Sequence, residues 1–351
     1  MSEEISTRSA TQLLVVVVVV TALAFAEDFL RPIAIAFLVT VFITAAKDRF
    51  RRLGLSETLA LSGSLLVFIL VTGVVIYVLG VQVDAITGAW PRYVDRFDEL
   101  VRETTRWLGP TISSELGEAY AKLDLTKTVP GLLGSAGSVM GNLILIWLYV
   151  GFMLAERGAL SSKLTSLFEQ PEHIAKAHDT ATQIIGGIRD YIWMKTLISV
   201  FTAAVSYAVL KLLGLDFAET WALLIFFLNY IPNVGSVLGV LFPAALALIQ
   251  FDTSWQFLVI AILLTSTQFI IGNVVEPAFM GRSLNLSSFV VIVSLTFWGT
   301  LWEFTGAFLS VPLTAAIAIA CSKIPSWRWF AVLLSKDGRI EIERPVAQIV
   351  E

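Results

Sequence analysis

The sequence predicts an all-α polytopic integral membrane protein with about eight membrane-embedded segments, and three observations lead to this prediction. Of the 351 residues, 56% are hydrophobic and only 15% are charged, and the mean hydropathy is +0.80. Such a chain cannot cover a globular surface with polar side chains. Apolar runs close to the length that a helix needs to cross a bilayer recur along the chain. In the C-terminal half, two longer runs are broken by polar and helix-interrupting residues, which predicts two broken or re-entrant helical hairpins.

Residues 1–80 predict three transmembrane helices, because three apolar runs fall at 11–26, 29–46 and 57–80. The first run is also long enough for the core of a signal peptide, and the small-x-small triplet at 24–26 resembles a cleavage site. Acidic residues offset Arg8, however, so the positive segment that precedes such a core is missing. We therefore expect an uncleaved first helix.

Residues 81–136 predict an extracytoplasmic amphipathic helical segment. Its apolar positions recur at intervals of three to four residues and later seven, at Ile86, Trp90, Val94, Phe97, Val101 and Leu108. No cluster of site-like residues accompanies them, which favours contact with the bilayer surface or with a second copy over guarding a pathway. A transmembrane helix at 137–155 follows, and then a cytoplasmic amphipathic helix at 156–190 that runs directly into the next span.

The region 191–325 is the predicted transport region. It contains spans at 191–213 and 254–275 and two apolar segments, 217–251 and 286–323, which are too long for one helix each. Polar breaks at 229–235 and 299–306 would fold each segment into arms of about 16 to 18 residues, or about 24 to 27 Å. A re-entrant hairpin and a pair of short spans both fit this length. Residues 326–351 form the predicted cytoplasmic tail.

The distribution of positive charge predicts that both termini lie in the cytoplasm. In that orientation 16 of the 24 Lys and Arg side chains are cytoplasmic, as the positive-inside rule requires. The two hairpins then enter the membrane from opposite sides, which in outline is an inverted-topology repeat. Small residues and prolines recur at comparable places in the two hairpins, although such residues are common wherever membrane helices pack closely.

Two polar rows on neighbouring spans are candidate linings of a path. At 100° per residue, the side chains of Thr265, Gln268, Gly272 and Glu276 lie within about 80° of one another, and Asn273 lies beside them. A matching row on the 191–213 span consists of Lys195, Ser199, Thr202 and Ser206. We expect these rows to face each other and not the lipid. The alternative is that small hydroxyl residues simply allow close helix packing.

The first break combines Asn229, Pro232, Asn233 and Gly235. Proline removes one backbone donor and frees a carbonyl, so a helix ends here. The two asparagine side chains either bind solute or cap the broken helix ends, and we favour solute binding.

Glu276 and Glu303 are the acidic residues of interest, because an ionised carboxylate at the centre of a membrane helix costs about 2.5 to 3.5 kcal/mol. If these carboxylates lie at membrane depth, we expect them to exchange a proton or cation, or to form an ion pair with Arg282 or Lys195. For Glu276, next to Pro277 near the predicted cytoplasmic exit, a partly hydrated structural position is an equal alternative.

Composition argues against several other classes of protein. The net charge of −4 and the scattered basic residues give no footprint for nucleic acid. One cysteine and two histidines support neither a disulfide framework nor a zinc site, so we expect no metal and no cofactor. No nucleophile, base and acid set appears at useful spacing, so we expect no catalytic residue and no enzyme.

Five motifs in order across 184–324 resemble the AI-2E (autoinducer-2 exporter) family of bacterial membrane proteins. They are Gly187-Ile188-Arg189-Asp190-Tyr191, Leu213-Gly214-Leu215, Asn229-Tyr230-Ile231-Pro232-Asn233-Val234-Gly235, Asn273-x-x-Glu276-Pro277-x-x-Met280-Gly281 and Gly306-x-x-Leu309-x-x-Pro312. The resemblance implies a multi-pass protein of the bacterial inner membrane that exports a small polar signal, with H⁺ or Na⁺ as a coupling ion in some members. It also implies a homo-oligomer. The chain departs from the family pattern at Asn233, Ser236 and Glu303, which suggests that Glu303 is a specialisation of this chain. A family name given for one solute does not by itself define the solute of another member.

These observations lead to one expectation and two alternatives. We expect a transporter that exports a small polar metabolite such as autoinducer-2 by alternating access between the two hairpins. A sodium/proton-type cation antiporter is the first alternative. A membrane scaffold that transports nothing is the second, and the amphipathic helices would then be its working surfaces.

Overall fold

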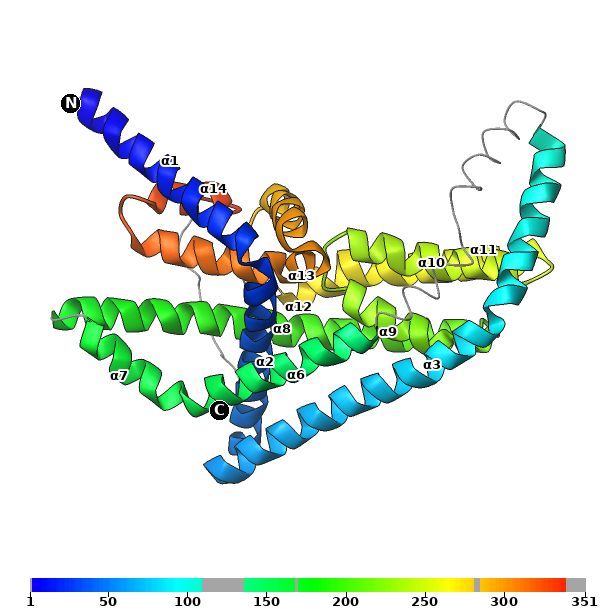
Figure 1. The fold of residues 1–351 in the computed structure, drawn as a ribbon, viewed down its shortest axis with the longest axis horizontal. Coiled ribbons are helices and arrows are strands. Elements are labelled where there is room, and N and C mark those ends of the chain that lie inside the picture. The colour runs from blue at the N-terminus through cyan, green and yellow to red at the C-terminus, as the bar shows by residue number, and fades with distance from the viewer. Residues whose placement is uncertain (1, 109–135, 168–169, 281–284, 339–351) are drawn as a thin grey trace. The chain divides into compact units, whose positions relative to one another are not determined.

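The computed structural model describes residues 2–108, 136–167, 170–280 and 285–338, and the elements in these ranges are helices (Figure 1). One isolated bridge, between Leu286 and Ser335, is the extent of strand-like pairing that the described residues contain. The all-α prediction is confirmed for this part of the chain. The helices form two compact units: Met1–Ala45, Asn142–Ile192 and Arg282–Glu351 make up the first unit, and Ala46–Gly141 and Trp193–Gly281 make up the second.

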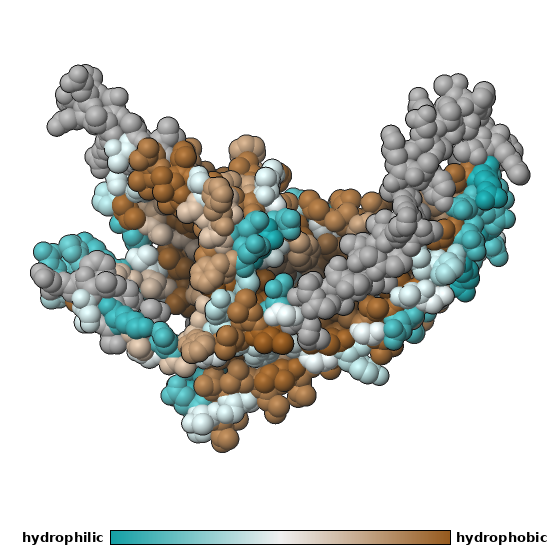
Figure 2. All heavy atoms as spheres, in the orientation of Figure 1, coloured by the Kyte–Doolittle hydropathy of each residue, from teal (hydrophilic) through white to brown (hydrophobic). Residues whose placement is uncertain are grey.

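Within the described residues, five helical stretches are long and apolar enough to cross a membrane: Glu27–Arg52, Glu57–Glu103, Pro171–Leu212, Ser254–Phe279 and Ser288–Lys323. Shorter apolar helices lie at Leu14–Phe25, Gly141–Ala155, Ala218–Leu228 and Val234–Gln250. Apolar residues also cover much of the surface seen in Figure 2, as lipid contact requires. A polytopic membrane protein is therefore supported, and the number of eight segments stays a prediction.

The first unit is built around the bent helix α13 (Ser288–Lys323), which packs against α14 (Arg328–Leu334) and α1 (Ser2–Phe25). The unit also contains most of α2 (Glu27–Arg52), most of α6 (Ala136–Ala155), α7 (Arg157–Leu167) and the start of α8 (Pro171–Leu212). Its tryptophan-rich core consists of Trp298, Trp302 and Leu309, packed against apolar side chains of α1 and α2.

The second unit gathers α3 (Glu57–Leu108) and the rest of α8 with α9 (Ala218–Leu228), α10 (Val234–Gln250), α11 (Ser254–Ile270), the π-helix η1 (Ile271–Val275) and α12 (Glu276–Met280). Helix α10 packs against both α9 and α11. The core between them is apolar and consists of Leu210, Leu215, Ala218, Ala247, Ile260 and Leu264.

Helix α3 differs from the prediction in being continuous across position 80. The third span and the described part of the amphipathic segment form one helix of 52 residues, with Pro91 inside it. The polar end of this helix packs against α9 and α10, where Tyr93 donates to Asp216 at 2.5 Å and Arg92 donates to the same carboxylate at 2.9 Å. The remaining part of the predicted segment, 109–135, lies outside the described residues, as does most of the predicted C-terminal tail, 339–351.

The helix predicted at 156–190 is divided in the structure, because α7 ends at Leu167 and α8 begins at Pro171. Helix α8 runs without interruption from the amphipathic segment into the span that begins at Tyr191. The first predicted break lies between α9 and α10, and the second is a bend inside α13, where Trp302 and Glu303 have non-helical dihedral angles. That these breaks are re-entrant stays a prediction.

Candidate functional site

The candidate site begins with a buried polar row on α8. Lys195 is 3% exposed, and Ser199, Thr202 and Ser206 are each 0% exposed. Their spacing of four, three and four residues places them on one face of the helix. The sequence predicts this row, and the structure turns it toward the interior of the second unit.

The broken end of α9 meets this row at Asn229. Its side-chain amide donates to the Ser199 hydroxyl at 3.0 Å, and both side chains are buried. Next to it, the Tyr230 and Thr196 hydroxyls lie 2.6 Å apart. Two side chains at the end of α9 are therefore held by hydroxyl side chains on α8.

The turn that follows is shaped by Gly235. A Cβ at this position would lie 1.8 Å from the carbonyl oxygen of Leu228, so the backbone of α10 begins in contact with the end of α9. Pro232 is half-buried, whereas Asn233 is exposed and has a φ of 60° at the N-cap of α10. Its ψ is −51°, and the Val234 N–H donates to the Pro232 carbonyl at 2.6 Å, so Asn233 is the central residue of a γ-turn.

Gln268 on α11 is the second buried amide of the site. It is 7% exposed, and its Nε2 lies 3.0 Å from the point that a Cβ on Gly239 would occupy. The glycine on α10 therefore makes room for the amide. We find no hydrogen-bond partner for this side chain within the described part of the chain, so the amide is available to a ligand.

Other members of the predicted α11 stripe lie elsewhere. The buried face of this stretch runs through Ile260, Leu264, Gln268 and Ile271, and Gln268 alone among these belongs to the polar stripe. Thr265 and Asn273 are exposed, and Asn273 donates to the carbonyl of Phe269 in the preceding turn at 3.0 Å. The structure thus brings Gln268 into the interior of the second unit and leaves these two side chains on its surface.

Glu276 follows directly on the π-helix η1 and pairs with α8. The Lys195 ammonium lies 2.5 Å from the Glu276 carboxylate, and their side chains are 4% and 26% exposed. Unpaired, either charge would be costly inside a membrane. Pairing with Lys195 was one of the two expectations for this carboxylate. The other candidate partner, Arg282, lies outside the described residues.

The second break, in the first unit, repeats part of this local design. A Cβ on Gly306 would lie 1.8 Å from the carbonyl oxygen of Trp298, and Glu303 has a φ of 53°. Between the two arms, Ser294 donates to the Ser310 carbonyl at 2.9 Å and pairs with the Thr314 hydroxyl. Here the buried polar groups satisfy one another, in contrast to Gln268 in the second unit.

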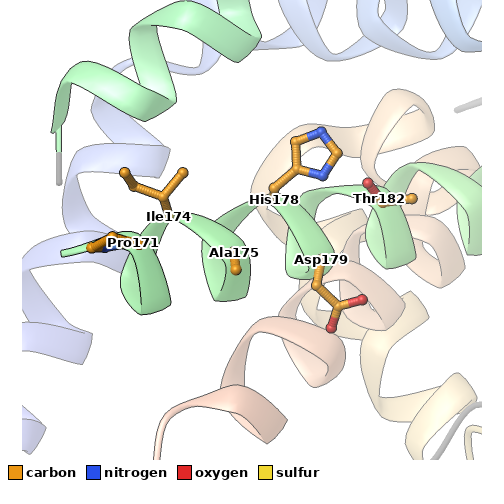
Figure 3. Close-up of a pocket in the computed structure, with 6 residues that line it drawn as sticks. All are labelled: Pro171, Ile174, Ala175, His178, Asp179 and Thr182. Atoms are coloured by element: carbon orange, nitrogen blue, oxygen red, sulfur yellow. The ribbon is translucent and has the colours of Figure 1, made fainter.

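A search for other sites gives weaker candidates. An open hollow of about 590 Å³ lies along the start of α8, lined by Pro171, Ile174, Ala175, His178, Asp179 and Thr182 (Figure 3). These residues come from one helix and bring no set of polar groups together. Within the described residues, no three His, Cys, Asp or Glu side chains are grouped as metal ligands would be.

The sequence profile of the AI-2E family transporter matches residues 13–326. The chain belongs to this family. It is 30% identical over 323 residues to the "AI-2 transport protein TqsA" of Escherichia coli, covering 91% of this chain and 93% of that protein. It is 27% identical to the "Putative transport protein YhhT" of Escherichia coli, covering 94% of each. A "Putative transport protein" of Borreliella burgdorferi is 33% identical over 60% of this chain and 57% of its own.

Family membership makes this chain a bacterial membrane transporter, and the relatives are named as transport proteins and not as enzymes. The profile covers both helix breaks and the α8 row. The buried contacts of Asn229, Gln268 and Glu276 are therefore candidates for the machinery of transport.

Sequence reasoning missed Arg31, whose guanidinium contacts Glu303 at 3.4 Å. A signal for it was present, because Arg31 stands at the start of the second apolar run, four residues after Glu27. A charge at such a position has to find a partner. The partner was not predictable, because it lies 272 residues further along the chain.

Proposed function

We propose that the chain exports a small polar metabolite, of which autoinducer-2 is the type, by alternating access, and that its solute-binding position lies in the second unit. The observation that carries this proposal is the buried hydrogen bond from Asn229, at a broken helix end, to Ser199 on α8. Non-helical backbone is tolerated at membrane depth where it is buried in protein or lines a water-filled cavity. Polar side chains gathered at such a break are what a polar solute requires.

The chemistry of this position suits a hydroxyl-rich solute. Asn229 and Gln268 each offer an amide with two donors and an acceptor, and Ser199 offers a hydroxyl that does both. A buried amide without a partner costs about 1 to 3 kcal/mol. Among the described residues, the Ser206 hydroxyl on the α8 row is buried without a partner, so a solute that hydrogen-bonds to it removes a cost of this kind and is favoured over an apolar molecule of the same size.

The α9–α10 hairpin would act as one gate. Its tip is held on α8 by the Asn229 contact and by the Tyr230–Thr196 hydroxyl pair. A solute that competes for these hydrogen bonds loosens the tip, and Thr202 and Ser206 continue the polar face along α8. Pro232, Asn233 and Gly235 form the turn of this gate. We propose Asn273 as a further solute-binding residue and Thr265 as a residue that lines the path.

Coupling to a cation is the second part of the proposal. Lys195 occupies one side of the Glu276 carboxylate, and a proton or Na⁺ that displaced the ammonium would change the contact between α8 and α12. Glu303 at the second break is the other coupling candidate. We also propose that the protein resides in the inner membrane as a homo-oligomer, with both termini in the cytoplasm.

Flux measurements in proteoliposomes test the solute position. Asn229→Ala and Gln268→Leu should each lower the flux of a transported hydroxyl-rich solute about ten-fold or more, because each removes a hydrogen bond of about 1 to 3 kcal/mol. Thr267→Val is the matched control on α11, since the Thr267 hydroxyl bonds to its own helix at Leu263. Undiminished flux in both variants would favour a scaffold or a different path.

A cation/proton antiporter is a second candidate, favoured by the Lys195–Glu276 pair. In that case Glu276→Gln abolishes the pH change that a sodium gradient drives in vesicles. Solute flux without such a pH change would rule out this candidate and leave the exporter.

A further inference from the structure

The corner between α1 and α2 receives the bend of α13, and all three helices lie in the first unit. The indole nitrogen of Trp302 donates to the backbone carbonyl of Leu23 at 3.1 Å. The same indole belongs to the cluster that packs against Leu30 and Leu38 on α2. We call this surface, formed by Leu23, Leu30 and Leu38, the seat of the α13 bend.

A charge contact lies beside the seat. Arg31 on α2 donates to the Glu303 carboxylate at 3.4 Å and also pairs with Glu27 one turn earlier. The Glu303 side chain is 79% exposed, and that of Arg31 is 21% exposed. The Arg31 Nε is buried and has no hydrogen-bond partner among the described residues. One N–H donor of this guanidinium is therefore unpaired.

The backbone of Glu303 indicates that the residue is held in place. Its φ of 53° and ψ of −135° lie in a region that glycine enters freely and other residues rarely do. Such a conformation costs free energy and persists where the surroundings impose it. The contacts next to this residue are the Trp302 hydrogen bond to Leu23, the Arg31 contact with the Glu303 carboxylate, and the close approach of Gly306 to the Trp298 carbonyl.

We propose that Arg31 is a positioning residue that holds the α13 bend on its seat through Glu303, and that transport requires this contact to break and re-form. The second half of the statement rests on the proposed function, and the first half does not. An exposed ion pair shifts a two-state population by about two- to five-fold. That strength suits a contact that is made and broken repeatedly, in contrast to the Lys195–Glu276 pair, in which the ammonium is buried and the carboxylate is 26% exposed.

Cysteine labelling tests the seat without any knowledge of the solute. Leu301 is half-buried in the same cluster, so Leu301→Cys in a Cys321→Ser background should react faster with a maleimide when the bend leaves its seat. We expect Arg31→Ala and Glu303→Gln each to raise the labelling rate about two- to five-fold. The double variant should react no faster than either single variant, because both remove one contact.

Two further variants separate positioning from general destabilisation. Arg31→Lys keeps a charge and should give a labelling rate between those of the native chain and Arg31→Ala. Arg52→Ala, at the exposed end of the same helix, should leave the rate unchanged. Unchanged labelling in Arg31→Ala, or rates that multiply in the double variant, would overturn the seat.

Flux measurements decide the second half. For a solute that the native chain carries, Arg31→Ala should change the transport rate at least two-fold in either direction. Arg31→Lys should give an intermediate rate. Raised labelling with unchanged flux overturns the requirement for transport and keeps the seat. Absence of flux in the native chain across hydroxyl-rich solutes and Na⁺ counts against the proposed function, whereas the labelling still decides the seat.

Discussion

Gly235 and Gly306 fix the two bends on which the transport hypothesis depends. In each case an added Cβ would lie 1.8 Å from a backbone carbonyl oxygen in the preceding arm, well inside any tolerated contact. A residue with left-handed φ precedes each glycine, Asn233 in one bend and Glu303 in the other. The two bends thus share a local solution, in which the chain reverses so sharply that the second arm starts against the backbone of the first.

Substitution of these glycines should be costly because a backbone oxygen cannot move away as a side chain can. We expect Gly235→Ala and Gly306→Ala each to destabilise the protein by about 1 to 3 kcal/mol. Thermal unfolding in detergent measures this loss. Gly272→Ala and Gly151→Ala are the controls, since nothing lies within 4 Å of their added Cβ. Equal melting temperatures for Gly235→Ala and Gly272→Ala would show that the bend relaxes freely.

At the scale of elements, α3 is the helix whose role changes most between sequence and structure. Its amphipathic end was expected to lie on the bilayer or on a second copy. In the structure it packs against α9 and α10, and Tyr93 and Arg92 both bind Asp216 in the turn before α9. The Gln250 side chain at the end of α10 accepts a hydrogen bond from the backbone N–H of Asp216, so both arms of the hairpin are joined at this point. We call the contacts of Tyr93, Arg92 and Gln250 with Asp216 the clamp.

We expect the clamp to restrain the base of the α9–α10 hairpin. Tyr93→Phe and Asp216→Asn should increase amide hydrogen exchange in 214–222 and in the facing part of α3, because the contact that joins them is lost or weakened. Asp84→Asn, at an exposed position on the same helix, serves as the control. Exchange rates in the two clamp variants that match this control would mean that apolar packing alone holds the base.

Helix period and break chemistry account for what the sequence predicts correctly. The α8 row follows from spacing alone, and the first break follows from a proline between two asparagines. The predicted polar stripe on α11 is not the buried face of the helix. The apolar side chains of Ile260 and Leu264 are buried there instead. The wider turn of η1 then shifts the phase of everything after Ile271, which no 100° projection includes.

Contacts between distant segments were beyond prediction for a different reason. Hydropathy ranks the membrane helices but does not say which of them touch. The sequence predicts the pairing of Glu276 with Lys195 as one of two alternatives, because a charge inside a membrane needs a partner of opposite sign. The Asn229–Ser199 and Trp302–Leu23 hydrogen bonds join residues that are far apart in the sequence. The local sequence around each residue does not indicate its partner.

At the scale of the whole molecule, the predicted topology places 16 of the 24 Lys and Arg on the cytoplasmic side. Single cysteines in a Cys321→Ser background test this in intact cells. A membrane-impermeant maleimide should label Arg102→Cys on the outer end of α3 and leave Leu55→Cys and Lys336→Cys unlabelled until the cells are permeabilised. Labelling at position 55 before permeabilisation would reverse the orientation.

The length of α3 has a practical consequence. Its 52 residues make about 78 Å of helix measured along the axis, which turns part-way along (Figure 1), against about 30 Å of hydrocarbon, so we expect a large part of α3 to lie outside the lipid. Antibody fragments raised against the polar end of α3 would bind close to the contact of Tyr93 and Arg92 with Asp216. Such fragments would add recognisable mass for particle alignment in electron microscopy. They could also disrupt the clamp contacts from outside the membrane.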